Sequence, residues 1–308
     1  MKPISVIIPV YNREDLVVRT LDSVYAQTYR PIELIVVDNN STDSSVKTVE
    51  RWKDTHQHSD FDIILTHENK RGAANARQAG FNKATSDVVM FFDSDDAMRP
   101  ELISKVMERF RTHPNVDMVY WQTAILTPDG RTTTKRFSSC NLLRRHIFNG
   151  MFCTISYAVK ADYFKKCGGW NPVLTGWDDW ELGLRLLLNN PVIEPIPEPL
   201  VVIYPQTESI TGINFKSKHG EWEKAIEAME KVSAAQKEPL RSQLQRMLLY
   251  RRVNLAALYK AEGAADIAES LLEQSLNTSF LPPWRKCLLR LIYHYTSHGG
   301  RAAYLLWN

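Results

Sequence analysis

The sequence lacks most of the features that would assign it to a specialised class of protein. It has four cysteines in 308 residues, and none stands in the close pairs typical of zinc sites or disulfide frameworks. We therefore expect reduced thiols and a cytoplasmic protein. No apolar run reaches the roughly 18 residues that a membrane-spanning helix needs, and the first residues do not form a secretory signal peptide. The formal net charge of +3 is too small to indicate nucleic-acid binding.

Glycine-rich phosphate-binding loops are also missing. No Gly-x-Gly-x-x-Gly follows the first expected strand, where residues 9–12 are Pro-Val-Tyr-Asn. This absence argues against a dinucleotide-dependent dehydrogenase. The lack of a glycine-rich, basic loop at the same place argues against a nucleotidyltransferase.

Strand-like and helix-like segments alternate over the first part of the chain. Apolar runs rich in β-branched residues predict strands at 4–10, 33–38, 62–66, 87–93 and 116–122. Between them, helices are predicted from near Asn12, after residue 43, over 72–84 and from Pro100. The alternation predicts an α/β domain with a mostly parallel sheet that helices cover on both faces.

From about residue 216 the strands give way to helices. Segments 221–236, 240–262 and 264–276 are predicted helices, and the last two join at Gly263 like one tetratricopeptide hairpin. One hairpin cannot form a solenoid, which needs about three repeats. We therefore expect a domain over residues 1–215 and an α-helical appendage over residues 216–308.

The last segment is basic and amphipathic, because no acidic residue follows Glu273. Its basic residues are Arg285, Lys286, Arg290 and Arg301. Its apolar stripe consists of Trp284, Leu288, Leu291, Ile292 and Tyr295. Either this stripe packs on the α/β domain and the basic residues face solvent, or residues 284–307 lie on an anionic membrane surface.

A first acidic cluster, Asp93-Ser94-Asp95-Asp96, directly follows an apolar strand. Ligands in α/β folds bind beyond the carboxyl ends of the strands. Mutual repulsion would raise the pKa values of these carboxylates unless a cation sits among them. Magnesium or manganese held here could bridge the two phosphates of a nucleoside diphosphate. The alternative is a capped turn in which Asp96 begins the helix near Pro100.

A second acidic cluster opens a leucine-rich helix at residues 176–181, Gly-Trp-Asp-Asp-Trp-Glu. Acids at a helix N-terminus can simply offset the helix dipole. The functional alternative is a general base that takes a proton from an acceptor hydroxyl. Two exposed tryptophans beside it, Trp177 and Trp180, would suit a sugar ring.

Four segments together resemble the ordered signature of glycosyltransferase family 2. They are 5–12 (Ser-Val-Ile-Ile-Pro-Val-Tyr-Asn), 36–43 (Val-Val-Asp-Asn-Asn-Ser-Thr-Asp), 92–96 (Phe-Asp-Ser-Asp-Asp) and 177–181 (Trp-Asp-Asp-Trp-Glu). The resemblance covers roughly residues 3–210. It implies a GT-A fold, inversion at the anomeric carbon and a divalent metal, Mn²⁺ or Mg²⁺.

The resemblance also implies roles for individual residues. Those assigned to nucleotide binding are Pro9, Tyr11, Asn12, Glu14, Asp38, Asn39, Arg77, Asp93 and Ser94. Asp95 is the implied metal ligand together with Asp93, and Asp179 is the implied catalytic base, with Trp177, Asp178 and Trp180 on the acceptor side. Two positions depart from the family pattern. Asn39 replaces a frequent aspartate, which leaves the nucleotide base open, and Asp178 replaces the more usual glutamate.

These patterns predict an inverting transferase that moves a sugar from a nucleotide-diphosphate-sugar, a UDP-sugar by preference, to an acceptor hydroxyl. The expected acceptor is a glycan or a lipid-linked molecule of cell-envelope or polysaccharide biosynthesis, and no nucleic-acid partner is expected. The protein would be cytoplasmic. Residues 284–307 could in addition bring it into peripheral contact with the inner face of the cytoplasmic membrane. A non-catalytic sugar- or nucleotide-sugar-binding module with a scaffolding helical tail is the alternative. The acids at 93, 95 and 179 argue against it.

Overall fold

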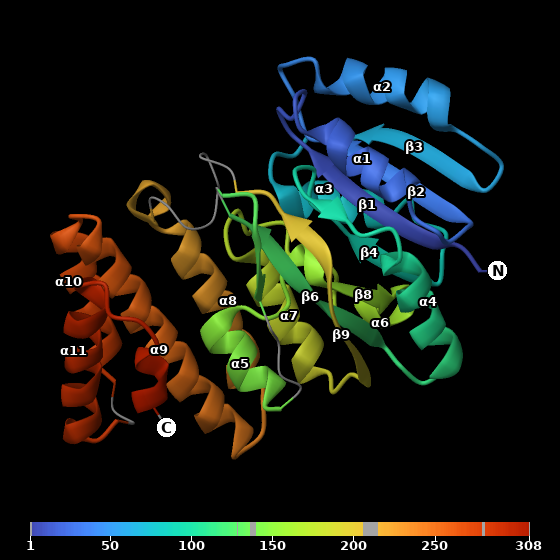
Figure 1. Ribbon diagram of the computed structural model, residues 1–308. Coiled ribbons are helices and arrows are strands. Elements are labelled where there is room, and N and C mark those ends of the chain that lie inside the picture. The colour runs from blue at the N-terminus through green and yellow to red at the C-terminus, as the bar shows by residue number, and fades with distance from the viewer. Residues whose placement is uncertain (1, 128, 136–139, 206–214, 279–280, 308) are drawn as a thin grey trace. The chain divides into compact units, whose positions relative to one another are not determined.

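The computed structural model describes residues 2–127, 129–135, 140–205, 215–278 and 281–307. The chain forms two compact units (Figure 1). The first comprises residues 1–142 and 151–207, and the second comprises residues 143–150 and 208–308. A short segment from the middle of the sequence therefore belongs with the C-terminal helices. In the described part of the chain, no helix combines the length and the apolar character that a bilayer span requires.

The first unit is built on a single sheet, whose described strands follow the order β3-β2-β1-β4-β8-β6-β9-β5, with β7 beside β6. The strands are β1 (Ile4–Val10), β2 (Ile32–Asp38), β3 (Phe61–His67), β4 (Val88–Phe91), β5 (Ala97–Met98), β6 (Met118–Leu126), β7 (Thr132–Lys135), β8 (Tyr157–Lys160) and β9 (Ile193–Ile203). The half formed by β3, β2, β1 and β4 is parallel, as predicted. Because these four strands run the same way, their carboxyl ends share one edge of the sheet.

The other half of the sheet is mixed, which the prediction of a mostly parallel sheet did not foresee. β8 runs antiparallel to both β4 and β6, whereas β9 runs parallel to β6 and antiparallel to β5. No strand was predicted between residues 123 and 215. The reason is clearest in β9, which contains Pro195, Pro197 and Pro199, because proline removes a donor from the ladder and usually argues against a strand.

Helices cover both faces of the sheet, as predicted (Figure 1). The helices of this unit are α1 (Val17–Tyr25), α2 (Ser45–His56), α3 (Ala73–Phe81), α4 (Leu102–Thr112), α6 (Ala161–Lys166) and α7 (Asp178–Leu188), with a 3₁₀ turn η1 (Thr154–Ser156). Alternate side chains of β1 serve the two faces: Val6 and Ile8 belong to the core of α1, α2 and α4, and Ile7 to that of α3, α6 and α7.

Gly80 lets α3 approach the sheet closely. A Cβ atom at this position would lie 2.4 Å from the Ile7 side chain and 3.0 Å from that of Val37. Glycine is therefore the residue that fits between α3 and strands β1 and β2. This contact fixes the height of α3 over the sheet, and with it the position of Arg77 one turn earlier in the helix.

The second unit is helical. Its helices are α5 (Leu142–Asn149), α8 (Glu221–Ala234), α9 (Leu240–Ala261), α10 (Ala265–Leu276) and α11 (Pro283–Ser297), with 3₁₀ turns η2 (Phe215–Lys218) and η3 (Ala303–Leu306). The long helix α9 packs against α8, α10 and α11. The predicted helices at 221–236, 240–262 and 264–276 agree with α8, α9 and α10 to within two residues at each end.

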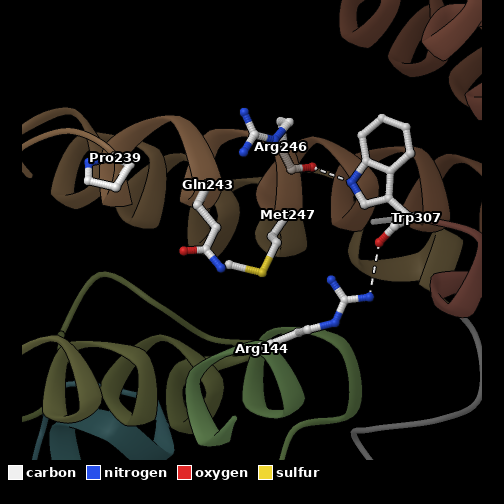
Figure 2. Close-up of a pocket in the computed structure, with 6 residues that line it drawn as sticks. All are labelled: Arg144, Pro239, Gln243, Arg246, Met247 and Trp307. Atoms are coloured by element: carbon white, nitrogen blue, oxygen red, sulfur yellow. Dashed lines mark hydrogen bonds between the residues drawn. The ribbon is translucent and has the colours of Figure 1, made fainter.

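A cavity of about 210 Å³ lies in this second unit (Figure 2). The Trp307 indole N–H donates to the carbonyl oxygen of Arg246 on α9 at 2.9 Å, and Arg144 on α5 donates to the Trp307 carbonyl oxygen at 3.0 Å. Pro239, Gln243 and Met247 complete the wall. The two hydrogen bonds thus join α5 and the end of the described chain to α9.

Candidate active site

The loops after β1 and β2 are held together by side chains that were predicted to line a nucleotide pocket. Asn12 has φ +50°, a left-handed conformation that asparagine tolerates. Its N–H donates to the Ser41 hydroxyl at 3.1 Å, and its Oδ1 accepts the N–H of Thr42 at 2.8 Å. Glu14 accepts the N–H of Ser44 at 2.7 Å. Both side chains therefore fix the neighbouring loop.

Asp38 ends β2 with almost all of its carboxylate buried. One oxygen accepts the backbone N–H of Ser41 at 3.2 Å. The other lies 2.8 Å from His67 Nδ1 and accepts the N–H of Asn40 at 3.2 Å. No role was predicted for His67. Parallel pairing of β2 with β3 sets it directly opposite Asp38, so the strand register is the signal that would have found it.

Asn39 fixes the loop formed by residues 68–72. Its side-chain amide donates to the carbonyl oxygens of Glu68 and Lys70, both at 2.8 Å, and its Oδ1 accepts the N–H of Gly72 at 2.8 Å. An aspartate could make neither of the first two bonds, because a carboxylate only accepts. The departure from the family pattern at this position therefore has a structural explanation within the chain.

Replacing Asn39 by Asp is expected to lower the free energy of unfolding by about 1–3 kcal/mol, since the two hydrogen bonds to the carbonyl oxygens of Glu68 and Lys70 are lost. Urea denaturation of both proteins measures the difference. Asn82→Asp is the matched control, because the exposed Asn82 side chain accepts a bond from Gln78 that an aspartate can also accept. If Asn39→Asp were as stable as the parent chain, the loop would be held by other contacts.

Tyr11 and Arg71 form a pair at the surface of this region. Tyr11 is 42% exposed. The Arg71 guanidinium lies 5.3 Å from the centre of its ring and donates to its hydroxyl at 3.2 Å. The ring is therefore held in place with one side open to solvent. Two other predicted residues frame the same edge: Pro9 pairs with Val37 in the sheet, and Ser94 is buried after β4.

The carboxylates of the first acidic cluster are in different environments. Asp93 pairs with Arg77, whereas Asp95 lies 3.7 Å from Arg13 Nε and keeps a partly exposed carboxylate. Burial and the neighbouring Asp93 raise the pKa of Asp95. Asp96 is buried, accepts the backbone N–H of Tyr204 at 3.0 Å, and has its pKa raised to about 8 by burial and by Asp93. Asp96 is therefore a structural acid.

The alternative of a cap at Asp96 is wrong. The residue that precedes α4 is Glu101, whose side chain makes no cap hydrogen bond, and the N–H of Ile103 in the first turn donates to Gln27 Oε1 at 2.9 Å. Asp96 instead links the turn after β4 to α1, because its carbonyl oxygen accepts the Thr20 hydroxyl at 2.7 Å. Arg19 donates to the carbonyl oxygen of Asp95 and stacks on the Tyr204 ring, 3.8 Å from its centre.

Arg77 joins the two acidic clusters. From α3, one end of its guanidinium donates to Asp93 at 2.7 Å and the other to Asp178 at 2.9 Å. The side chain is only 8% exposed and lies over the Trp170 ring, 4.8 Å from its centre. Two carboxylates that are 85 residues apart in sequence, by the difference of their numbers, are thus held on one buried cation.

Asp179 is the second residue of α7 and directly follows Asp178. Burial and the neighbouring Asp178 raise its pKa to about 7, although Arg77 acts in the opposite direction. One oxygen accepts the N–H of Trp180 at 2.7 Å. Tyr157 is fully buried, and burial together with the charge of Asp179 raises its pKa as well. A carboxylate with a pKa near neutrality can take a proton from a hydroxyl group at physiological pH.

The expectation of two exposed tryptophans beside this carboxylate is wrong. Trp177 is 8% exposed and Trp180 is 2% exposed, and their ring centres lie 5.8 Å apart. Trp177 adopts φ +53° as it leads into α7. The two indoles therefore pack the start of the helix from within.

A complete metal site of protein ligands does not form, because no three Cys, His, Asp or Glu side chains of the described residues come together in a suitable way. The candidate ligands Asp95 and Asp93 supply two hard carboxylates. Such a pair fits a magnesium- or manganese-like cation that takes its remaining ligands from phosphate oxygens and water.

Comparison with known proteins identifies the family of the chain. The family model described as "Glycosyl transferase family 2" matches residues 5–161. An uncharacterized glycosyltransferase of Haemophilus influenzae is 27% identical over 223 residues, which cover 70% of this chain and 69% of that protein. Several further glycosyltransferases match over about a third of their own length.

Solved structures show the same fold over almost the whole chain. S. aureus TarS 1-349 in complex with UDP-GlcNAc has a TM-score of 0.70 and 18% sequence identity, covering 99% of this chain and 89% of that one. The mannosyltransferase PcManGT from Pyrobaculum calidifontis, in complex with GDP-Man and Mn²⁺, has a TM-score of 0.61 and 21% identity, covering 96% and 83%. At these identities the likeness establishes the fold.

Proposed function

Because this chain belongs to glycosyltransferase family 2, we propose that it transfers a sugar, with inversion, from a UDP-sugar to the hydroxyl group of a cell-envelope glycan or lipid-linked acceptor. The observation that carries the proposal is the pairing of Arg77 with Asp93 and Asp178, which sets the carboxylates after β4 beside the start of α7. A donor diphosphate at the first cluster would then have its sugar next to Asp179.

The hydrogen bonds of Asp38 support uracil as the base. A carboxylate offers about four acceptor positions, and Asn40, Ser41 and His67 take three of them. Uracil presents a single ring N–H, whereas guanine presents a ring N–H and an amino group to a carboxylate. Asp38 therefore has one acceptor position left, which matches the single ring N–H of uracil. The complex of TarS with UDP-GlcNAc is in keeping with this choice, although the complex of PcManGT holds GDP-Man.

We assign the following steps to this chain's residues. Asp179 removes the proton of the acceptor hydroxyl, the oxygen attacks the anomeric carbon from one face, and the nucleoside diphosphate leaves from the other. Asp95 and Asp93 would hold the divalent cation, which when bound neutralises charge on the leaving diphosphate. Arg77 keeps Asp93 and Asp178 in place and lowers the pKa of Asp179 toward the working range.

A thermal-shift experiment with nucleotides tests the proposal. With Mn²⁺, UDP should raise the unfolding midpoint far more than GDP, because a ligand at about 100 times its Kd stabilises the fold by about 2.7 kcal/mol. EDTA should remove most of the shift. Release of UDP from a UDP-sugar then separates an enzyme from a binding module. A shift with GDP alone would overturn the choice of base, and binding without any turnover would favour the non-catalytic alternative.

A further inference from the structure

Helix α11 presents an apolar stripe to solvent. Trp284, Leu291 and Tyr295 are 61%, 65% and 53% exposed, and their spacing of seven and four residues puts them on one side of the helix. The opposite side, which includes Leu289 and Ile292, is buried within the helical unit. Of the stripe predicted from the sequence, only Ile292 is fully buried. The fold therefore does not require the outer side to be apolar.

The chain adds a second exposed apolar group directly after α11. Leu305 and Leu306 in η3 are 64% and 61% exposed. The turn before them packs on the helix: the Gly300 N–H donates to the Tyr295 carbonyl oxygen at 2.9 Å, and a Cβ atom on Gly300 would come within 2.4 Å of the Tyr295 ring. Residues 284–306 thus hold five of the eight large exposed hydrophobic side chains in the described chain. This concentration marks a patch and not a random scatter.

Positive charge accompanies the exposed stripe. No acidic residue follows Glu273, and Glu273 itself pairs with Arg290 at 2.8 Å. Lys286 and Arg301 have no side-chain partner among the described residues. Arg285 lies 5.0 Å from the centre of the Trp284 ring. Within α11 and η3 the stripe is therefore accompanied by positive charges and by no carboxylate, and the neighbouring acids Glu269 and Glu273 lie on α10.

We propose that α11 and η3 dock on an anionic lipid bilayer, with the outer side of α11 in the headgroup region. Charge complementarity favours this occupant, since basic side chains around an apolar stripe match anionic headgroups. Trp284 and Tyr295 bound the stripe at its two ends, and both side-chain types favour the interface between lipid and water. A second copy of the chain would bring two like-charged patches together, which is unfavourable. The inference does not depend on the proposed function.

Vesicle flotation of the full chain tests this surface. The protein should float with vesicles that contain phosphatidylglycerol and should bind much less to vesicles of phosphatidylcholine alone, with binding weakened by salt. The double variant Trp284→Gln, Leu291→Gln should lose most of the binding. Val192→Gln removes an equally apolar exposed side chain elsewhere, 49% exposed, and should bind as the parent does.

The charge contribution is tested separately. Lys286→Gln with Arg301→Gln should weaken binding to phosphatidylglycerol vesicles by about 25-fold, because each basic residue near the surface contributes about fivefold. Lys237→Gln makes the same change on an exposed residue away from α11 and should have no effect. Thermal unfolding checks that every variant is folded. Absent binding, binding unaffected by both double variants, or a dimer that the Trp284→Gln, Leu291→Gln variant disrupts would each overturn the proposal.

Discussion

Replacing Asp179 by Asn is expected to lower kcat by about 10²–10⁴-fold, the share that general-base catalysis supplies, while the affinity for UDP stays nearly unchanged. Asparagine cannot accept a proton, but its Oδ1 can still accept the Trp180 N–H that Asp179 binds at 2.7 Å. The start of α7 should therefore keep its shape. Steady-state kinetics with a UDP-sugar, together with UDP titration, measure the two effects.

The competing interpretation of Asp179 is that it only offsets the dipole of α7. Asp162→Asn provides the matched control, because Asp162 is an exposed acid in the first turn of α6. Loss of a dipole interaction costs about 0.3–1 kcal/mol of stability and should leave kcat intact. If Asp179→Asn behaved like Asp162→Asn in both measurements, Asp179 would not be the base.

The raised pKa of Asp179 makes the same assignment visible in pH profiles. For the parent enzyme, kcat/KM should rise with pH through about 7 and level off above it, since the free enzyme must hold the carboxylate unprotonated.

The effect of the raised Asp179 pKa on stability has the opposite sign. A carboxyl whose pKa rises from 3.8 to about 7 on folding binds more protons in the native state, so its contribution to stability falls as pH increases across that interval. Asp179→Asn should remove both dependences.

Much of the fold follows from the sequence where the strands are buried and regular. β1, β2, β3 and β4 are short runs of apolar residues, so their pattern predicts both the strands and the shared edge at which the acidic residues lie. The later half of the sheet is different. Its strand β7 is polar throughout (Thr-Thr-Thr-Lys), and prolines interrupt β9. Pairing across the sheet determines these strands, and local pattern does not reveal such pairing.

The site shows the same limit at the level of single side chains. The ordered motifs predicted which carboxylates belong to the site. What each carboxylate contacts is known only from the hydrogen bonds of the folded chain. Asp96 belongs to the acidic cluster in sequence, yet it accepts the N–H of Tyr204, 108 residues away. The tryptophans beside Asp179 were expected at the surface and are buried. Contacts made over long sequence separations decide these positions, and residue spacing along the chain carries no information about them.

Arg77 also makes its contacts over long sequence separations. Its replacement is the second prediction with a large expected effect, a loss of stability. Replacing it by Met keeps the volume but leaves Asp93 and Asp178 without their shared cation. Removing one partner from a buried ion pair costs about 3–5 kcal/mol. We expect about 3 kcal/mol here, because the Asp93 side chain is 35% exposed and solvent screens part of the repulsion. Denaturant unfolding measures the loss. Adding Asp178→Asn to Arg77→Met should recover part of it, since one uncompensated carboxylate disappears.

The pH profile distinguishes a positioning role of Arg77 from simple support of the fold. Arg77 lowers the pKa of Asp179, so Arg77→Met should shift the midpoint of the kcat/KM profile to higher pH as well as reduce its plateau. Arg185→Met is the matched control. Arg185 is a mostly buried arginine, 15% exposed, paired with the carboxylate of Glu181 at 2.8 Å, and its loss should destabilise the fold without moving the midpoint. A destabilised Arg77→Met enzyme with an unchanged midpoint would show that Arg77 acts on the fold alone, whereas an alkaline shift confined to this variant ties the two acidic clusters into one catalytic unit.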